Sequence, residues 1–294
     1  MAISVKLIRM QLSLLKHTQK ACDFAANRVA QDKIGLLMAR THGSKVSYST
    51  QVFKDFIGRW IVPKANTQPG VLLYLHGGGY VAGNIDYAKG FGTILAAKNG
   101  IRVFCAAYRL APENRFPSAV LDALEAYEYL LAYGYKAKDI ILCGESAGGG
   151  LIYALVHKLK ALSLPLPGGL IAISPWTDLT LSGESIETIG DRDASLSKDC
   201  LAYYAHLYTD DPENPLASPL FGDLTGFPPS LIYAGGCEIL LDDSVRMHKK
   251  LRESGCKSSL YVARNMWHAY VLYGVKPSPQ NHLQIGSFIK DVTR

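Results

Sequence analysis

A serine, a run of glycines and a histidine stand along this chain in the order that acyl-transfer chemistry requires. The serine, Ser146, is the centre of the segment GESAG at 144–148, which follows an apolar run and leads into a helical pattern. A serine on such a sharp turn needs small neighbours, because adjacent elements pass close to it. The helix behind it directs its positive end toward developing negative charge. This setting favours a nucleophile over an ordinary turn serine.

The segment HGGG at 76–79 directly follows an apolar run at 71–75. Consecutive glycines let backbone N–H groups turn toward a substrate oxygen, because no Cβ stands in the way. Together with the N–H of Ala147, such groups would bind the oxyanion of a tetrahedral intermediate. A phosphate-binding loop would continue as Gly-Lys-Ser or Gly-Lys-Thr, which this chain lacks. A plain flexible turn is the remaining alternative.

His268 lies after the apolar run at 260–263, on a predicted loop beyond the last strand. A general base for Ser146 belongs at that place. His76 is part of the glycine loop, and the other six histidines lack a strand-end setting. The chain order therefore favours His268 as the base.

The third member of a catalytic triad would follow the apolar run at 231–234, where three acids compete. Glu238 lies nearest the carboxyl end of that strand, where the active-site groups of parallel sheets collect. Asp242 and Asp243 also suit the cap and first turn of a helix at 242–254. With any of the three, the chain order is nucleophile, acid, base.

These residues must be positioned by an alternation of strands and helices. Short apolar runs, typical of strands buried on both faces, lie at 71–75, 101–107, 140–143, 170–173, 231–234 and 260–262. Helical patterns lie between them at about 87–98, 118–133, 148–162 and 242–254. The alternation predicts an α/β fold with a mainly parallel sheet and helices on both faces. Residues 1–40 read as helical and 46–63 as strands, and the aromatic-rich insertion at 179–215 suits a lid.

Bulk properties exclude several classes of protein. The 294 residues suit one domain, and the net charge of +6 is scattered, which does not indicate a nucleic-acid surface. Six cysteines without zinc or C-x-x-C spacing fit a reducing cytoplasm. The first 20 residues do not form a signal peptide, and no apolar stretch is long enough to span a membrane. No metal or organic cofactor is implied, because ligand spacing and a dinucleotide fingerprint are both absent.

Taken together, four segments resemble the hormone-sensitive lipase family of α/β-hydrolases, which includes bacterial carboxylesterases and arylacetamide deacetylase. They are HGGG at 76–79, YRLAPE at 108–113, GESAG at 144–148 and WH at 267–268. The likeness extends from about residue 46 to the C-terminus and includes SPWTDL at 174–179 and PLASPL at 215–220. It implies an α/β-hydrolase fold in a single domain, 1–294, with a helical cap formed by residues 1–45 and about 179–215.

The resemblance also implies roles for individual residues. The nucleophile, the base and the three oxyanion donors would be Ser146, His268 and the N–H groups of Gly77, Gly78 and Ala147. The family's acid position falls at Glu238, 30 residues before His268. Many members have Asp there, which leaves Asp242 as the second choice. We interpret Arg109 and Glu113 as an ion pair that holds their loop beneath the site.

The expected protein is thus a serine carboxylesterase that cleaves short- to medium-chain acyl esters of small molecules. An amidase or deacetylase would use the same residues. A receptor-like binding protein is the third interpretation, because the family's plant gibberellin receptors keep the pocket and lose the base. Either a monomer or a homodimer fits the sequence.

Overall fold

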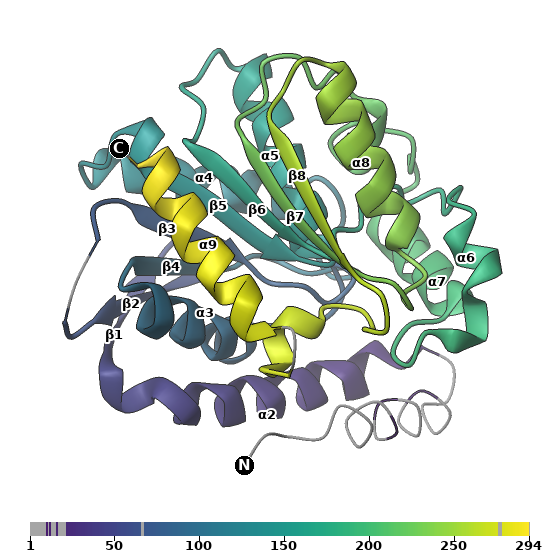
Figure 1. Cartoon of the computed structure of the whole chain (residues 1–294), viewed down its shortest axis with the longest axis horizontal. Coiled ribbons are helices and arrows are strands. Elements are labelled where there is room, and N and C mark those ends of the chain that lie inside the picture. The colour runs from purple at the N-terminus through teal and green to yellow at the C-terminus, as the bar shows by residue number, and fades with distance from the viewer. Residues whose placement is uncertain are drawn as a thin grey trace.

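The computed structural model describes residues 10, 12, 16, 22–65, 68–275 and 278–293. Eight strands in this part of the chain form one central sheet (Figure 1). They are β1 (Val46–Val52), β2 (Ile57–Pro63), β3 (Val71–Leu75), β4 (Arg102–Ala107), β5 (Ile140–Glu145), β6 (Gly169–Ile173), β7 (Ser230–Gly235) and β8 (Ser258–Ala263). Their order across the sheet is β1-β2-β4-β3-β5-β6-β7-β8.

The sheet is parallel except at one edge. β1 pairs with β2 and β2 with β4 in antiparallel fashion, and all remaining neighbours are parallel. The six predicted apolar runs coincide with β3 to β8, and the stretch at 46–63 forms the β1–β2 hairpin. The predicted α/β-hydrolase fold with a mostly parallel sheet is confirmed.

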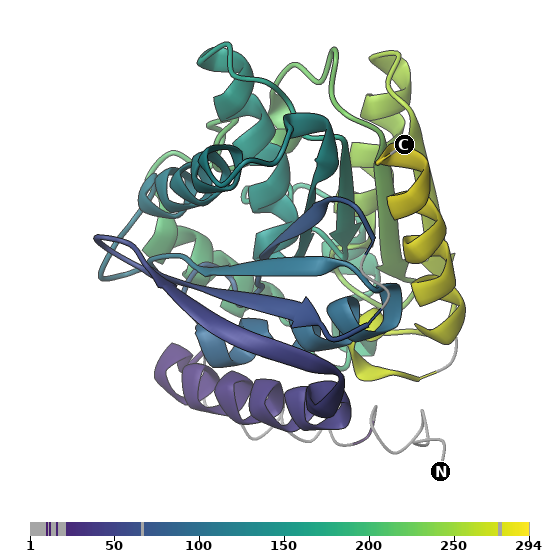
Figure 2. The same ribbon diagram turned by 90° about the vertical axis from the view of Figure 1, so that its left-hand side faces the viewer.

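Helices cover both faces of this sheet (Figure 2). They are α2 (Phe24–His42), α3 (Ile85–Asn99), α4 (Ser118–Ala132), α5 (Ala147–Ala161), α6 (Ser185–Thr188), α7 (Lys198–Tyr208), α8 (Leu241–Glu253) and α9 (Ser278–Val292). Leu73 and Leu75 of β3 join the apolar cluster with α4, α5 and α8, whereas Leu72 and Tyr74 join the cluster with α3 and α9. Alternate side chains of β3 thus enter two different cores, which explains why this strand contains no charged residue.

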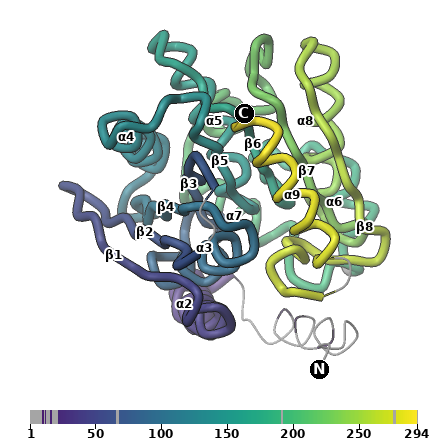
Figure 3. The backbone as a smooth tube through the Cα atoms, turned by 60° about the vertical axis from the view of Figure 1, so that its left-hand side comes forward, coloured from purple at the N-terminus to yellow at the C-terminus, as the bar shows by residue number. Residues whose placement is uncertain are grey.

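The helical patterns predicted between the strands correspond to α3, α4, α5 and α8. α9 is not among the predicted helices. In α2 the helix continues through Gly35, where the sequence pattern weakens. A methyl group at Gly90 of α3 would lie 2.7 Å from the Cα of Gly35, so the two helices touch through their backbones (Figure 3).

Residues 1–21, apart from Met10, Leu12 and Lys16, lie outside the described residues, so the predicted helix at 1–40 is seen only from Phe24 on. The insertion at 179–215 contains α6 and α7 and no strand among its described residues. None of the described helices combines the length and the apolar character that crossing a bilayer requires.

Candidate active site

Ser146 occupies a strained turn between β5 and α5. Its φ and ψ are 55° and −123°, a conformation that L-residues rarely adopt. Small neighbours are indispensable here. A methyl group on Gly148 would lie 2.1 Å from the carbonyl oxygen of Leu75, and one on Gly144 would lie 2.3 Å from that of Gly148. The tight strand–turn–helix expected around this serine is therefore present.

Backbone hydrogen bonds hold this turn in place. The N–H of Ser146 donates to the carbonyl of Ile173 at the end of β6, at 2.9 Å. The Ser146 carbonyl accepts from the N–H of Gly150 at 3.0 Å and from that of Trp176 at 2.9 Å. The neighbouring strand thus supports a conformation that the local chain would not keep alone.

The glycine loop passes directly beside Ser146. A methyl group on Gly77 would lie 3.0 Å from the Cβ of Ser146. Gly78 and Gly79 have φ values of +119° and +63°, which only glycine adopts readily. The loop therefore needs its glycines both for conformation and for its approach to Ser146.

One predicted oxyanion donor requires correction. The N–H of Gly77 donates to the Oε1 atom of Glu145 at 2.6 Å, so this N–H is not available to a substrate oxygen. The N–H groups of Gly78, Gly79 and Ala147 have no protein acceptor within the described ranges. The sequence does not show this, because the occupied N–H depends on the orientation of a side chain 68 residues away.

Glu145 is a buried carboxyl group beneath the glycine loop. Besides Gly77, it accepts a hydrogen bond from the Tyr74 hydroxyl at 2.5 Å on Oε2. Burial raises its pKa to about 7, although the hydrogen bonds oppose this shift. Sequence reasoning gave this residue no role. The feature of the sequence that could have identified it is its position as the one acid in a strand that is otherwise apolar on both faces.

Glu238 and His268 come together at the carboxyl ends of β7 and β8. Glu238 is fully buried, and its Oε2 lies 3.6 Å from Nδ1 of His268. That distance is longer than a hydrogen bond. Burial lowers the pKa of His268, but the charges of Glu238, Asp193 and Glu145 outweigh burial and raise it above its usual value.

The two competing acids are engaged elsewhere. Asp242, in the first turn of α8, accepts from the N–H of Ser185 at 2.8 Å, and its own N–H donates to the Ser185 hydroxyl. Asp243 accepts from the N–H of Thr177 at 2.6 Å. Burial raises the pKa of Asp243 to about 8. Among the described residues, Glu238 is the carboxylate that lies within 4.0 Å of the His268 ring.

Asp193, from the insertion at 179–215, is a further buried acid at this edge. Its Oδ2 accepts the N–H of Ile239, the residue after Glu238, at 2.9 Å. Its Oδ1 accepts the N–H of Ser195 at 2.8 Å. The insertion is thereby fastened to the loop that carries Glu238, a link that sequence reasoning did not find.

The predicted ion pair between Arg109 and Glu113 is wrong, because each residue has another partner. Arg109 binds Asp122 of α4, with Nη2 and Oδ1 2.6 Å apart, and this carboxylate is fully buried. A buried carboxylate requires such a charge partner. Glu113 instead binds Arg28 of α2 at 2.8 Å, and this contact lowers the pKa of Glu113 to about 2.

α7 lies over the glycine loop and is tied to the segment before α2. A methyl group on Gly79 would lie 2.7 Å from the ring of Tyr204, whose hydroxyl accepts from Asn27 of α2 at 2.5 Å. One turn earlier, Cys200 forms a disulfide with Cys22. The spacing of the cysteines did not indicate this bond. The other four cysteines are free: Cys105, Cys143, Cys237 and Cys256.

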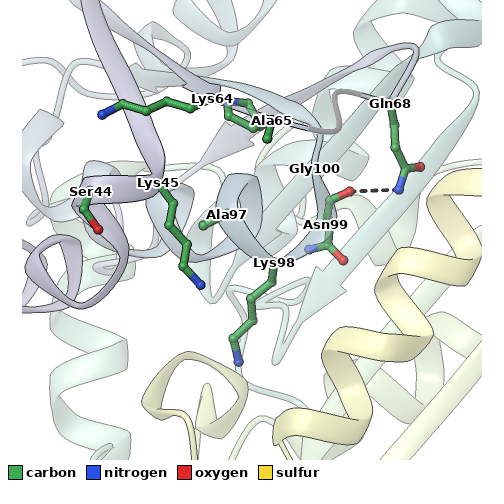
Figure 4. A pocket seen from close by; sticks show the side chains of 10 residues that line it. Ser44, Lys45, Lys64, Ala65, Gln68, Ala97, Lys98, Asn99 and Gly100 are labelled. Carbon is green, nitrogen blue, oxygen red and sulfur yellow. Dashed lines mark hydrogen bonds between the residues drawn. The ribbon is translucent and has the colours of Figure 1, made fainter.

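An open cavity of about 440 Å³ lies elsewhere, where the end of α3 meets residues 44–45, 63–65 and 68 (Figure 4). Lysines 45, 64 and 98 line it, and none of them forms an ion pair with an acid in the described chain. It contains none of the predicted site residues. No group of three or more His, Cys, Asp or Glu side chains in the described part of the chain is arranged to hold a metal ion.

Comparison with known proteins agrees with the observed fold. The profile of a family described as alpha/beta hydrolase fold matches residues 72–272. An esterase of Acinetobacter venetianus is 38% identical over 206 residues, which are 69% of this chain and 68% of the relative. An acetyl-hydrolase of Streptomyces hygroscopicus is 36% identical over 238 residues, covering 80% and 79%.

Among solved structures, a hormone-sensitive lipase from a metagenome library superimposes with a TM-score of 0.93. Its sequence identity is 31%, and the match covers 100% of this chain and 99% of that chain.

Proposed function

The chain belongs to the hormone-sensitive lipase family of α/β-hydrolases and is a carboxylic ester hydrolase, and on this premise we propose that it cleaves small acyl esters through Ser146, His268 and Glu238. The observation that carries the proposal is the buried Glu238–His268 pair, with Nδ1 and Oε2 3.6 Å apart. It lies at the same edge of the sheet as the strained turn of Ser146.

In the first half-reaction, His268 takes the hydroxyl proton of Ser146 while Oγ attacks the ester carbonyl carbon. The tetrahedral intermediate collapses to an acyl-enzyme, and His268 gives its proton to the departing alcohol. Water then attacks the acyl group, with His268 again as base, and the carboxylic acid leaves. Glu238 orients the imidazole and stabilises its charged form throughout.

For the oxyanion we propose the N–H groups of Gly78, Gly79 and Ala147. Their support is that no described acceptor occupies them. Ala147 is also the first residue of α5, where the helix dipole favours negative charge. In this scheme Gly77 positions the loop through its bond to Glu145 and does not donate to the substrate.

We further propose that one domain, 1–294, carries a cap formed by residues 1–45 and about 179–215. The packing of Tyr204 on Gly79 supports this role for the insertion, and the bond between Arg28 and Glu113 supports it for α2. Ser146 and His268 are less than a tenth exposed. Such enclosure suits short- to medium-chain acyl esters better than micellar fat.

Hydrolysis of p-nitrophenyl esters from acetyl to palmitoyl tests this function, with Ser146→Ala alongside. We expect turnover to peak at short chains and to fall on the order of 10⁶-fold in the variant. Acetanilides in the same assay test the amidase alternative. Activity that survives in the variant, or a peak at palmitoyl, would contradict the proposal.

Cytoplasmic localisation remains a prediction, and the disulfide between Cys22 and Cys200 counts against it, because disulfides are rare in a reducing compartment. A monomeric or homodimeric state also remains a prediction. β8 ends the sheet with Tyr261 and Val262 exposed on it, a surface through which two copies could pair. Sedimentation of the purified chain decides between the two states, and cell fractionation tests the location.

A further inference from the structure

Ser174 stands where β6 ends, and none of its surface is exposed. Its φ is +48°, a left-handed value that costs a serine conformational energy. Its N–H donates to the carbonyl of Tyr233 in β7 at 2.6 Å. A strained, fully buried polar residue at the catalytic edge of the sheet needs an explanation beyond packing.

The side chain of Ser174 lies between the acid loop and the base loop. Its hydroxyl donates to Oε2 of Glu238 at 2.7 Å and accepts the N–H of Ala269 at 3.0 Å. The directions are fixed, because an amide N–H only donates and an ionised carboxylate only accepts. The single hydroxyl proton therefore points at Glu238.

Ser174 is the main support of the Glu238 carboxylate. The Oε1 atom of Glu238 has no hydrogen-bond partner among the described residues. Its Oε2 accepts the hydrogen bond from Ser174 and lies 3.6 Å from Nδ1 of His268. Ala269, which follows His268, also has a positive φ of 55°. One hydroxyl thus links the triad acid to the backbone that carries the base.

We propose that Ser174 is a positioning residue of the esterase, which holds Glu238 against His268 and fixes the loop that carries His268. This inference rests on the proposed function. Ser174 does not touch the substrate in this scheme, so its contribution is to the orientation of the acid–base pair. Removing its hydroxyl is expected to lower kcat and to leave KM nearly unchanged.

Two variants separate this role from a purely structural one. Ser174→Ala and Ser174→Gly both delete the hydroxyl, but glycine also relieves the strain of the positive φ. The two variants should therefore differ in thermal stability and lose kcat equally, by roughly 10- to 100-fold, the size expected for a hydrogen bond to a charged group. Loss of activity that follows stability instead would overturn the proposal.

Ser218→Ala is the matched control. Ser218 is equally buried, and its hydroxyl accepts the N–H of Leu179 at 2.7 Å, away from the triad. It should keep kcat within about twofold of the parent, because no catalytic group depends on it. A kcat for Ser174→Ala within the same range as this control would also overturn the proposal.

A second readout does not need turnover. The pKa of His268 is measured by NMR in the Ser146→Ala background, with and without Ser174→Ala. Without the hydroxyl, the charged form of Glu238 loses its donor and supports the imidazolium less, so the pKa of His268 should fall by roughly one unit. Asp193 and Glu145, the other charges near the ring, are the same in both samples.

The NMR measurement, together with the ester assay, distinguishes failure of the proposed esterase function from failure of the coupling through Ser174. A fall in the pKa of His268, in a protein that cleaves no ester, would refute the esterase and retain the coupling through Ser174. An unchanged pKa in an active esterase would refute the coupling alone.

Discussion

The carboxyl edge of the sheet and the lysine-lined cavity at the end of α3 differ in what they cost the fold. The cavity encloses about 440 Å³, but its lysines are exposed. All of its lining residues lie in the described chain, and no non-glycine residue among them has a positive φ. At the carboxyl edge, four non-glycine residues have positive φ: Tyr80, Ser146, Ser174 and Ala269. Three acids are buried beside them: Glu145, Glu238 and Asp193.

This contrast indicates where chemistry is to be sought. Buried carboxylates and left-handed backbone both cost folding free energy, and proteins retain such features chiefly at functional sites. An open hollow bordered by solvated lysines costs little. Strain and buried acids together therefore identify the proposed catalytic region better than the volume of a cavity does.

The largest effect on kcat is expected from replacing the proposed triad acid, Glu238. Glu238→Gln should lower kcat by roughly 10⁴-fold, because the amide cannot stabilise the imidazolium of His268. Asp242→Asn, four residues further along the same segment, is the matched control and should keep kcat within about threefold of the parent. Steady-state ester hydrolysis measures both, and equal losses would mean that the acid has been misassigned.

The buried acid beneath the glycine loop should give the next effect, in the pH dependence of stability. The pKa of Glu145 is raised from 4.5 to about 7, so the folded chain holds a proton that the unfolded chain releases. The contribution of this proton to the free energy of unfolding is fully present below about pH 4.5, and roughly 3 kcal/mol of it is lost as the pH rises through 7. Asp243, whose pKa is raised to about 8, adds a loss in the same direction.

Glu145→Gln should remove its share of this loss and leave that of Asp243. Urea unfolding at a series of pH values that brackets both shifted pKa values measures the slope. The same slope in parent and variant would show that Glu145 is ionised in the folded chain at these pH values.

The weakest response is expected at the cavity. The ammonium group of Lys98 is partly desolvated although its side chain is largely exposed, and this and the nearby charge of Lys45 lower its pKa. Lys98→Gln therefore relieves a repulsion and removes no ion pair between described residues. Ester hydrolysis should stay within about twofold of the parent, since surface charges far from a site contribute little. A severe loss in kcat/KM would show that the cavity also contributes to ester hydrolysis, contrary to the contrast drawn between the two regions.

What the sequence predicts well is local. The turn around Ser146 and the strands of the sheet follow from short segments whose pattern is complete within about ten residues. The partners of side chains follow from tertiary packing. The hydroxyl of Ser174 meets Glu238 across 64 positions and Ala269 across 95, and no short pattern contains such a pair.

The two corrected expectations have the same cause. Gly77 and Arg109 lie in segments that the sequence identifies, but their partners, Glu145 and Asp122, are chosen by burial. A buried carboxylate takes the nearest available donor or cation, and proximity in the fold is not proximity along the chain.

The disulfide between Cys22 and Cys200 joins positions 178 residues apart, so it closes most of the chain into a covalent ring. The glycine loop and Ser146 lie inside this ring, whereas Glu238 and His268 lie on the tail that leaves it. A single proteolytic nick between residues 146 and 200 would open the ring without releasing a fragment. Ser146 and His268, the proposed nucleophile and base, would remain parts of one covalent molecule until a reductant cut the bond.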